Sequence, residues 1–117
     1  MPDNRLTSHL TPQTTLTSAI DSWAAYLADK GRSPNTIKAF LSDVHLLTSF
    51  LPEDTTLAKV TTKDLNRYFE WMENERDVPC SPKTLARRIP ATKALCRWLQ
   101  QSGVLLVDPA EKVAQRS

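Results

Sequence analysis

The segment from Ser81 to Gly103 most constrains the fold, because it carries the complete signal pattern of one long helix. Ser81 is a favourable N-cap, and Pro82 occupies the first helical position, where its missing N–H has no partner to lose. Gly103 can adopt the left-handed conformation that ends a helix. Apolar residues recur between these ends at helical spacing and predict a core-facing stripe: Leu85, Ile89, Leu95, Cys96 and Leu99.

Basic residues occupy the other faces of this predicted helix: Lys83, Arg87, Arg88, Lys93 and Arg97. No Asp or Glu occurs from Cys80 to Val107, so we expect an uncompensated positive face. A lone basic helix is more often a solvated surface than a binding site. Pro90 removes one N–H and clashes with the carbonyl of Ala86, which predicts a bend in the helix.

Three earlier segments show the same helical periodicity and predict further helices. We expect these helices to begin near Thr15, Ser33 and Thr61, and the first two to end near Gly31 and Pro52. Residues 52–60 predict a loop with Leu57 and Val60 turned inward, and residues 104–107 are apolar enough to pack back on the helices. Asp108-Pro-Ala-Glu111 has the cap, proline and acid of one more short helix.

The chain of 117 residues fits one domain, and its two glycines together with the helical periods disfavour a sheet. The fold class is therefore predicted to be all-α. We divide the sequence into a flexible lead-in at 1–14, a helical domain at 15–108, and a short helix with the start of a linker at 109–117.

Signals for catalysis or metal binding are absent from the sequence. It contains no HExxH, GxSxG or phosphate-loop motif, and Cys80 and Cys96 form no CxxC pair. His45 falls in a polar row without a second ligand, and Tyr26 is best explained as a packed aromatic. We expect no catalytic residue, no metal and no cofactor. Without an apolar run of membrane length or a signal core, we also expect a cytoplasmic protein and no membrane partner.

A repeated Ser-Pro-x-Thr motif opens two of the predicted helices, at Ser33–Thr36 and at Ser81–Thr84. Helix N-termini that present hydroxyls, backbone N–H groups and cations suit phosphates, and an arginine on such a helix can pair with guanine in a major groove. The same residues also cap helices, so the motif alone does not distinguish DNA binding from capping. The formal net charge of +2 is too small to decide the question.

The order of motifs resembles the N-terminal core-binding, or SAM-like, domain of tyrosine recombinases and phage integrases of the Xer type. The resemblance runs from about Leu16 to Val113. Four stretches carry it: Leu27-Ala-Asp-Lys-Gly-Arg-Ser-Pro-Asn-Thr36, Val60-Thr-Thr-Lys-Asp-Leu65, Ser81-Pro-Lys-Thr-Leu-Ala-Arg-Arg88 and Asp108-Pro-Ala-Glu111. It implies an orthogonal bundle of four main helices plus a short fifth, which clamps a recombination half-site.

In this family the second and fourth helices lie against the major groove, which implies DNA-binding positions here. These are Asn35, Thr36 and Lys38 on the second helix, and Lys83, Thr84, Arg87 and Arg88 on the fourth, with Arg32 and Arg97 as further phosphate contacts. The family often has Tyr-Arg where this chain has Phe40-Leu41. Fewer backbone contacts are therefore expected from the second helix.

The resemblance also implies the partners of the domain: double-stranded DNA, the catalytic domain of the same recombinase, and neighbouring protomers on DNA. The family's catalytic arginines, histidines and tyrosine belong to a downstream domain, so this chain is expected to supply the clamp without the chemistry. The alternative is a helical protein–protein interaction module with no DNA binding of its own.

Overall fold

Four α-helices form the structure, a computed structural model that describes residues 10–75 and 81–113. They are α1 (Leu16–Asp29), α2 (Pro34–Phe50), α3 (Thr62–Glu70) and α4 (Pro82–Gln101). A 3-10 turn, η1 (Leu57–Lys59), precedes α3, and a π-helical turn, η2 (Trp71–Glu75), continues it. The described residues contain no strand, only an isolated bridge between Thr15 and Thr56, which confirms the all-α prediction.

The predicted helix starts and stops are confirmed. The Ser33 and Ser81 side chains each accept the backbone N–H three residues later, at 3.2 Å. Thr61 and Asp64 form a reciprocal capping box at the start of α3. Gly31 and Gly103 follow α1 and α4 with φ of 81° and 82°, a conformation that residues with a Cβ rarely adopt.

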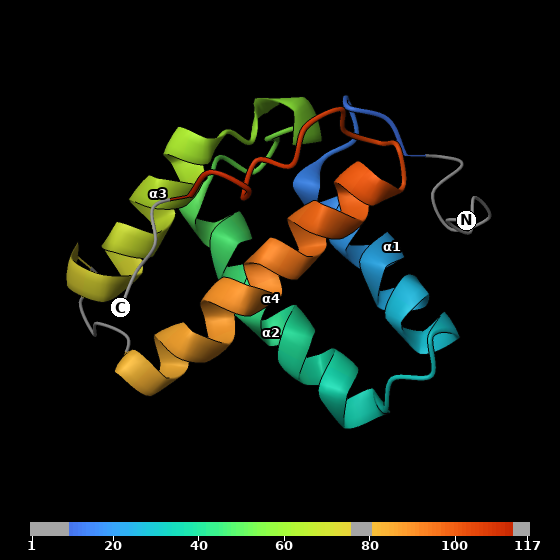
Figure 1. The fold of residues 1–117 in the computed structure, drawn as a ribbon, viewed down its shortest axis with the longest axis horizontal. Coiled ribbons are helices and arrows are strands. Elements are labelled where there is room, and N and C mark those ends of the chain that lie inside the picture. Colours follow the sequence, from blue (N-terminus) through green and yellow to red (C-terminus); the bar gives the residue numbers. More distant parts are fainter. Residues whose placement is uncertain (1–9, 76–80, 114–117) are drawn as a thin grey trace.

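Helix α2 lies in the middle of the bundle, packed by α1 and crossed by α4 (Figure 1). Aromatic pairs join the elements: the rings of Trp23 and Phe40 are 5.6 Å apart between α1 and α2, and those of Phe50 and Tyr68 are 5.5 Å apart between α2 and α3. The predicted apolar stripes supply the buried core, which includes Ile20, Trp23, Val44, Leu47, Leu65, Tyr68, Phe69, Met72, Leu95 and Leu99. The inward placement of Leu57 and Val60 is also confirmed.

Packed structure begins earlier than the boundary expected after residue 14. Leu10 is buried, and the carbonyls of Pro12 and Thr14 accept hydrogen bonds from Ala58 and Leu57 at 2.8 and 2.9 Å. Pro12 and Thr14 therefore pair with η1, and Leu10 is packed, where a flexible lead-in was expected. This pairing joins segments more than forty residues apart, so local sequence patterns did not indicate it. The rest of the predicted lead-in, residues 1–9, lies outside the described residues.

The C-terminal segment departs from two expectations. Residues 109–112 form turns in place of the short helix, with the Glu111 and Val113 N–H groups bonded to carbonyls three residues earlier. A segment this short gains too few i to i−4 hydrogen bonds to offset helix nucleation. Val104 and Ala110 are buried, and Thr62 donates to the Pro109 carbonyl at 2.7 Å. Of the four residues expected to pack back, Leu106 and Val107 are instead 95% and 68% exposed. Residues 114–117 lie outside the described residues.

Pro90 does not interrupt α4, which continues from Pro82 to Gln101. Pro90 is exposed, and Ala91 after it is fully buried. The packing of the C-terminal half of α4 against the core therefore carries the helix past the missing hydrogen bond. The predicted bend stays a prediction.

Candidate nucleic-acid interface

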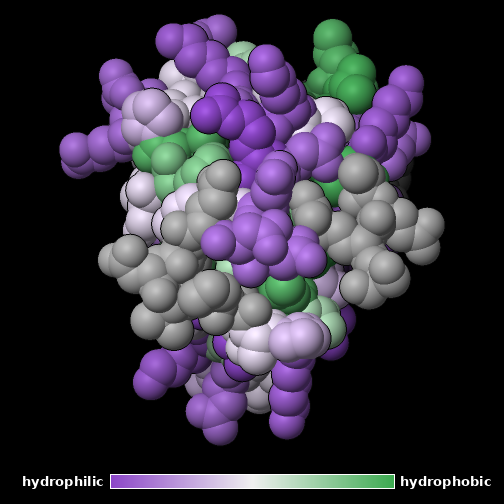
Figure 2. Space-filling view, turned by 90° about the vertical axis from the view of Figure 1, so that its left-hand side faces the viewer, coloured by the Kyte–Doolittle hydropathy of each residue, from purple (hydrophilic) through white to green (hydrophobic). Residues whose placement is uncertain are grey.

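The N-terminal ends of α2 and α4 lie along the same edge of the molecule, on opposite sides of the point where the two helices cross (Figure 1). In Figure 1 both helices begin at the lower edge of the view and cross further up, so that their first turns diverge from the crossing point. Figure 2, seen from the side on which α4 begins, shows hydrophilic side chains projecting from this lower end. Two helix starts separated by 48 residues of sequence (positions 34 and 82) thus lie along one edge of the bundle.

At the start of α2 the predicted site residues are accessible. Arg32, Asn35 and Lys38 are exposed, and Thr36 is partly buried. Thr36 interacts with the capping serine twice, since its N–H donates to the Ser33 Oγ at 3.2 Å and its Oγ1 accepts the Ser33 hydroxyl at 2.9 Å. Its own hydroxyl hydrogen stays available to an anion.

The start of α4 repeats this geometry. Lys83 is exposed, and Thr84 is partly buried, with its N–H 3.2 Å and its Oγ1 3.0 Å from the Ser81 Oγ. Thr15 and Ser18 form the same pair of contacts at the start of α1. The hydroxyl arrangement is therefore primarily a capping device, and the motif does not by itself identify a phosphate site.

Asp43 overturns the expectation that the basic face of α4 is uncompensated. This residue of α2 is 1% exposed, and its Oδ1 accepts a hydrogen bond from the Arg87 Nε at 2.9 Å. The Arg88 Nε lies 3.8 Å from the same oxygen. One buried carboxylate thus lies against two adjacent arginines where α2 and α4 cross, and the positive charge of α4 is partly neutralised from another helix.

The two arginines differ in accessibility. The Arg87 side chain is 59% exposed, whereas that of Arg88 is 18% exposed. The structure therefore leaves Arg87 available to a ligand and places Arg88 mainly inside the crossing. Both were predicted as DNA-binding residues, and these predictions now carry different weight.

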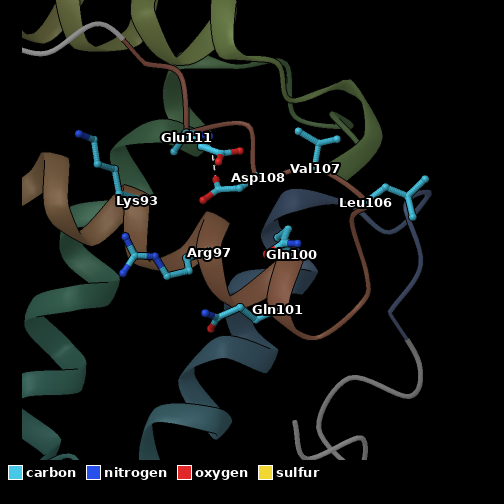
Figure 3. Close-up of a pocket in the computed structure, with 9 residues that line it drawn as sticks. Lys93, Arg97, Gln100, Gln101, Leu106, Val107, Asp108 and Glu111 are labelled. Carbon is cyan, nitrogen blue, oxygen red and sulfur yellow. Dashed lines mark hydrogen bonds between the residues drawn. The ribbon is translucent and has the colours of Figure 1, made fainter. Parts of the chain in front are cut away.

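Arg97 lies apart from the other predicted site residues. It lines a cavity of about 470 Å³ between the C-terminal half of α4 and the C-terminal segment. Lys93 and Arg97 project from α4 on one side of this cavity, and Asp108 and Glu111 lie on the other (Figure 3). Because carboxylates face its cations, this cavity does not favour phosphate, and it is separate from the lower end of the bundle.

An apolar groove of about 510 Å³ runs along α2 beside Lys38. Pro34, Ile37 and Leu41 form its apolar part, and Lys38, Ser42 and His45 line it as well. The polar row predicted on α2 thus borders partly buried apolar side chains.

Asp43 is the residue of this candidate site that the sequence patterns missed. It lies three positions after Phe40 and four before Leu47, within the apolar stripe of α2, and an acid at such a position needs a buried partner. That signal indicates a cation but does not say which one, because the choice depends on how the helices cross.

Cys96 and Tyr26 pack against other side chains, and His45 lies on the surface. Cys96 is buried, and burial, together with the charge of nearby Asp108, raises the pKa of its thiol to about 12. Tyr26 packs on Trp98 with ring centroids 5.3 Å apart, and His45 is exposed.

Within residues 10–75 and 81–113, no cluster of three His, Cys, Asp or Glu side chains could hold a metal ion. Cys80 lies outside these ranges. None of the described helices is long and apolar enough to cross a membrane.

Comparison with known proteins identifies a family and a set of relatives. The sequence profile of the family described as "Phage integrase, N-terminal SAM-like domain" matches residues 20–103. The tyrosine recombinase XerC of Mycobacterium sp. (strain JLS) is 32% identical over 97 residues, which cover 82% of this chain and 32% of that protein. XerD of Listeria innocua is 32% identical over 91 residues, covering 77% of this chain and 31% of that protein.

XerC of Mycobacterium tuberculosis is likewise 33% identical over 95 residues, covering 80% of this chain. The matched part is 31% of that relative, so the chain spans about a third of the length of these recombinases. No solved structure gives a significant match.

Proposed function

We propose that this chain, which belongs to the family of phage integrase N-terminal SAM-like domains, binds duplex DNA as the core-binding domain of a tyrosine recombinase. The observation that carries the proposal is that exposed cations come from the N-terminal halves of two crossing helices: Lys38 on α2, and Lys83 and Arg87 on α4, with Arg87 beside the crossing. Cations from two crossing helices suit the closely spaced phosphates of a duplex.

Each group has a distinct role in this proposal. Arg32, Lys38 and Lys83 contact phosphates and set the position of the domain on the duplex, without reading sequence. Asn35 and Arg87 contact base edges, since an Asn pairs with adenine and an Arg with guanine in the major groove. The Thr36 and Thr84 hydroxyls, already held by the capping serines, donate to phosphate oxygens.

Arg88 and Arg97 lie outside the proposed contact with DNA. Arg88 acts inside the crossing of α2 and α4 rather than on DNA, and Arg97 acts at most on a phosphate outside the main contact. The chemistry of strand cleavage belongs to the catalytic domain of the same recombinase. That domain and neighbouring protomers on DNA are the proposed protein partners.

The test is fluorescence-anisotropy binding to a randomised duplex pool across a salt series. With about four phosphates neutralised, log affinity falls against log salt with a slope of roughly −3.6. The variant Lys38→Ala/Lys83→Ala removes two of these contacts, so its slope falls to roughly −1.8. The matched control, Lys59→Ala/Lys63→Ala, removes two exposed lysines from η1 and the start of α3, at the other end of the molecule, and keeps the original slope.

A protein-interaction module is the second candidate, and one observation favours it. Leu106 and Val107 are exposed and adjoin an apolar cavity of about 380 Å³ lined by Leu57, Val60 and Pro109, among others. If the folded chain binds no duplex at low salt, or if both double variants lose affinity equally, the DNA proposal is wrong. The exposed apolar pair then becomes the first surface to test for a protein partner.

A further inference from the structure

We propose that Asp43 is a positioning residue for DNA recognition: it holds Arg87 by its Nε so that the two terminal nitrogens of the guanidinium face the DNA in one fixed orientation. This inference rests on the proposed function, because it concerns how that interface distinguishes sequences. It adds a buried acid to an interface that is otherwise defined by its cations.

The anchor itself is rigid. Asp43 lies on α2 next to Val44, which is fully buried, and four residues before Leu47, which is 1% exposed. A carboxylate held at a packed helix position cannot follow Arg87 outward. Its Oδ1 therefore defines a fixed point from which the guanidinium extends.

The contact with Asp43 uses only the Nε of Arg87 and leaves the two terminal guanidinium nitrogens unoccupied. A guanidinium has five N–H donors, one on Nε and the rest on the two terminal nitrogens. Here Nε donates to Asp43 at 2.9 Å, and within the described ranges Arg87 makes no other hydrogen bond or ion pair. Because the side chain is 59% exposed, the terminal nitrogens can form the bidentate pair that reads guanine O6 and N7.

Electrostatics gives Asp43 a second effect of opposite sign. A buried carboxylate neutralises part of the charge of Arg87, which weakens attraction to phosphates at any sequence. The same carboxylate limits the orientations of Arg87, which favours a base edge at one position. Asp43 thus trades non-specific affinity for discrimination between sequences.

Arg88 completes the anchor from the inner side. Its Nε is 3.8 Å from the oxygen that accepts from Arg87, and its side chain is mostly buried. This second cation compensates the buried carboxylate while Arg87 engages DNA. The adjacent arginines therefore have different functions, one exposed to the ligand and one supporting the acid.

The test compares the intact chain with Asp43→Asn, Arg87→Lys and Lys83→Ala. A preferred duplex is first selected from a randomised pool with the intact chain, and the affinity ratio between that duplex and a scrambled one is measured for each protein. Asn keeps the size of Asp43 but removes its charge, and Lys keeps the charge of Arg87 but cannot form a bidentate pair. Circular dichroism confirms that each variant is folded at the assay temperature.

We expect Asp43→Asn to lower the affinity ratio by about tenfold while affinity for the scrambled duplex stays equal or rises, because one base contact relaxes and one positive charge is released. Arg87→Lys lowers the ratio to a similar extent. Lys83→Ala lowers affinity for both duplexes and keeps the ratio. In nitrogen-15 spectra, the Arg87 Nε–H signal is resolved in the intact chain and shifts in Asp43→Asn.

If Asp43 only stabilised the fold, Asp43→Asn would lower the affinities for the selected and the scrambled duplex together. A lower affinity ratio with an equal or higher affinity for the scrambled duplex would therefore not follow from a merely structural role. An unchanged ratio in Asp43→Asn, or a parallel loss on both duplexes, overturns this inference while Lys83→Ala still reports DNA binding. If the intact chain binds neither duplex, the proposed function fails, and the positioning role fails with it.

Discussion

Truncation of Arg87 should destabilise the fold as well as change its surface. The variant Arg87→Ala removes the guanidinium that donates to Asp43 at 2.9 Å and leaves a carboxylate that is 1% exposed. A hydrogen bond to a charged group contributes about 1.5–3 kcal/mol, and breaking a fully buried ion pair costs about 3–5 kcal/mol.

The expected value lies near the lower end of these ranges for two reasons. Arg87 is 59% exposed, so solvent screens its charge, and the Arg88 Nε remains 3.8 Å from the carboxylate. We therefore expect Arg87→Ala to lower the free energy of unfolding by about 2 kcal/mol. For a domain of this size that corresponds to a fall in Tm of roughly 10 °C.

Urea unfolding followed by circular dichroism measures this effect, with Lys83→Ala as the matched control. Lys83 is exposed on the first turn of the same helix and forms no ion pair within the described ranges, so its truncation changes stability by less than about 0.5 kcal/mol. The double variant Asp43→Asn/Arg87→Ala should cost less than the sum of its single variants, by about 1 kcal/mol. If Arg87→Ala costs no more than Lys83→Ala, or if the two changes are additive, the contact does not stabilise the crossing of α2 and α4.

Three further predictions test other parts of the molecule. The pKa of Cys96 is raised from 9.0 to about 12, so its contribution to stability is complete below pH 9 and is lost as the pH rises toward 12. Urea unfolding at pH 8 and pH 10 should show a smaller decrease for Cys96→Ala than for the intact chain, and equal decreases would contradict this assignment. Gly31→Ala places a Cβ on a residue with φ of 81°, and no atom lies within 4 Å of that Cβ. Backbone strain alone should therefore lower the free energy of unfolding by about 1 kcal/mol in the same assay. An unchanged free energy of unfolding would mean that the turn relaxes. Leu10 is buried although it precedes the first helix, so Leu10→Ala should lower the free energy of unfolding by about 2 kcal/mol. Leu106 is exposed, so Leu106→Ala should leave that free energy unchanged. Equal effects of the two variants would show that Leu10 is not packed.

The contact between Arg87 and Asp43 also restricts which variants can test DNA binding. Removing Arg87 and Arg88 together would disturb a buried carboxylate, so lost binding could reflect lost folding. Lysines 38 and 83 avoid this difficulty because both are exposed. A charge-removal experiment at these two positions separates the interface from the fold.

The helix ends were predictable from sequence because capping is a local interaction. Ser33 and Ser81 bond to groups three residues away, and so do Thr61 and Asp64. The stops at Gly31 and Gly103 depend on one residue's preference for positive φ. Such contacts are decided within one helical turn, so the starts and stops agree with the sequence patterns to within a residue or two.

The candidate site was only partly predictable. The exposed positions of Asn35, Lys38 and Lys83 agree with their place outside the apolar stripes. The different accessibilities of Arg87 and Arg88 were not predictable, because adjacent residues in a helix point about 100° apart and only the partner helix decides which one it covers. The exposure of Leu106 likewise depends on where the C-terminal segment lies.

Local patterns therefore account for the four main helices, their ends and the stripes that form the core, since capping and periodicity act over a few residues. Only tertiary packing accounts for the contact between Asp43 and Arg87 across 44 positions of the chain, and for the bonds of Pro12 and Thr14 to η1. These contacts depend on the angle and offset at which helices and loops pack, which no local pattern encodes. The net charge of the candidate interface thus depends on the crossing of α2 and α4 as well as on the composition of each helix.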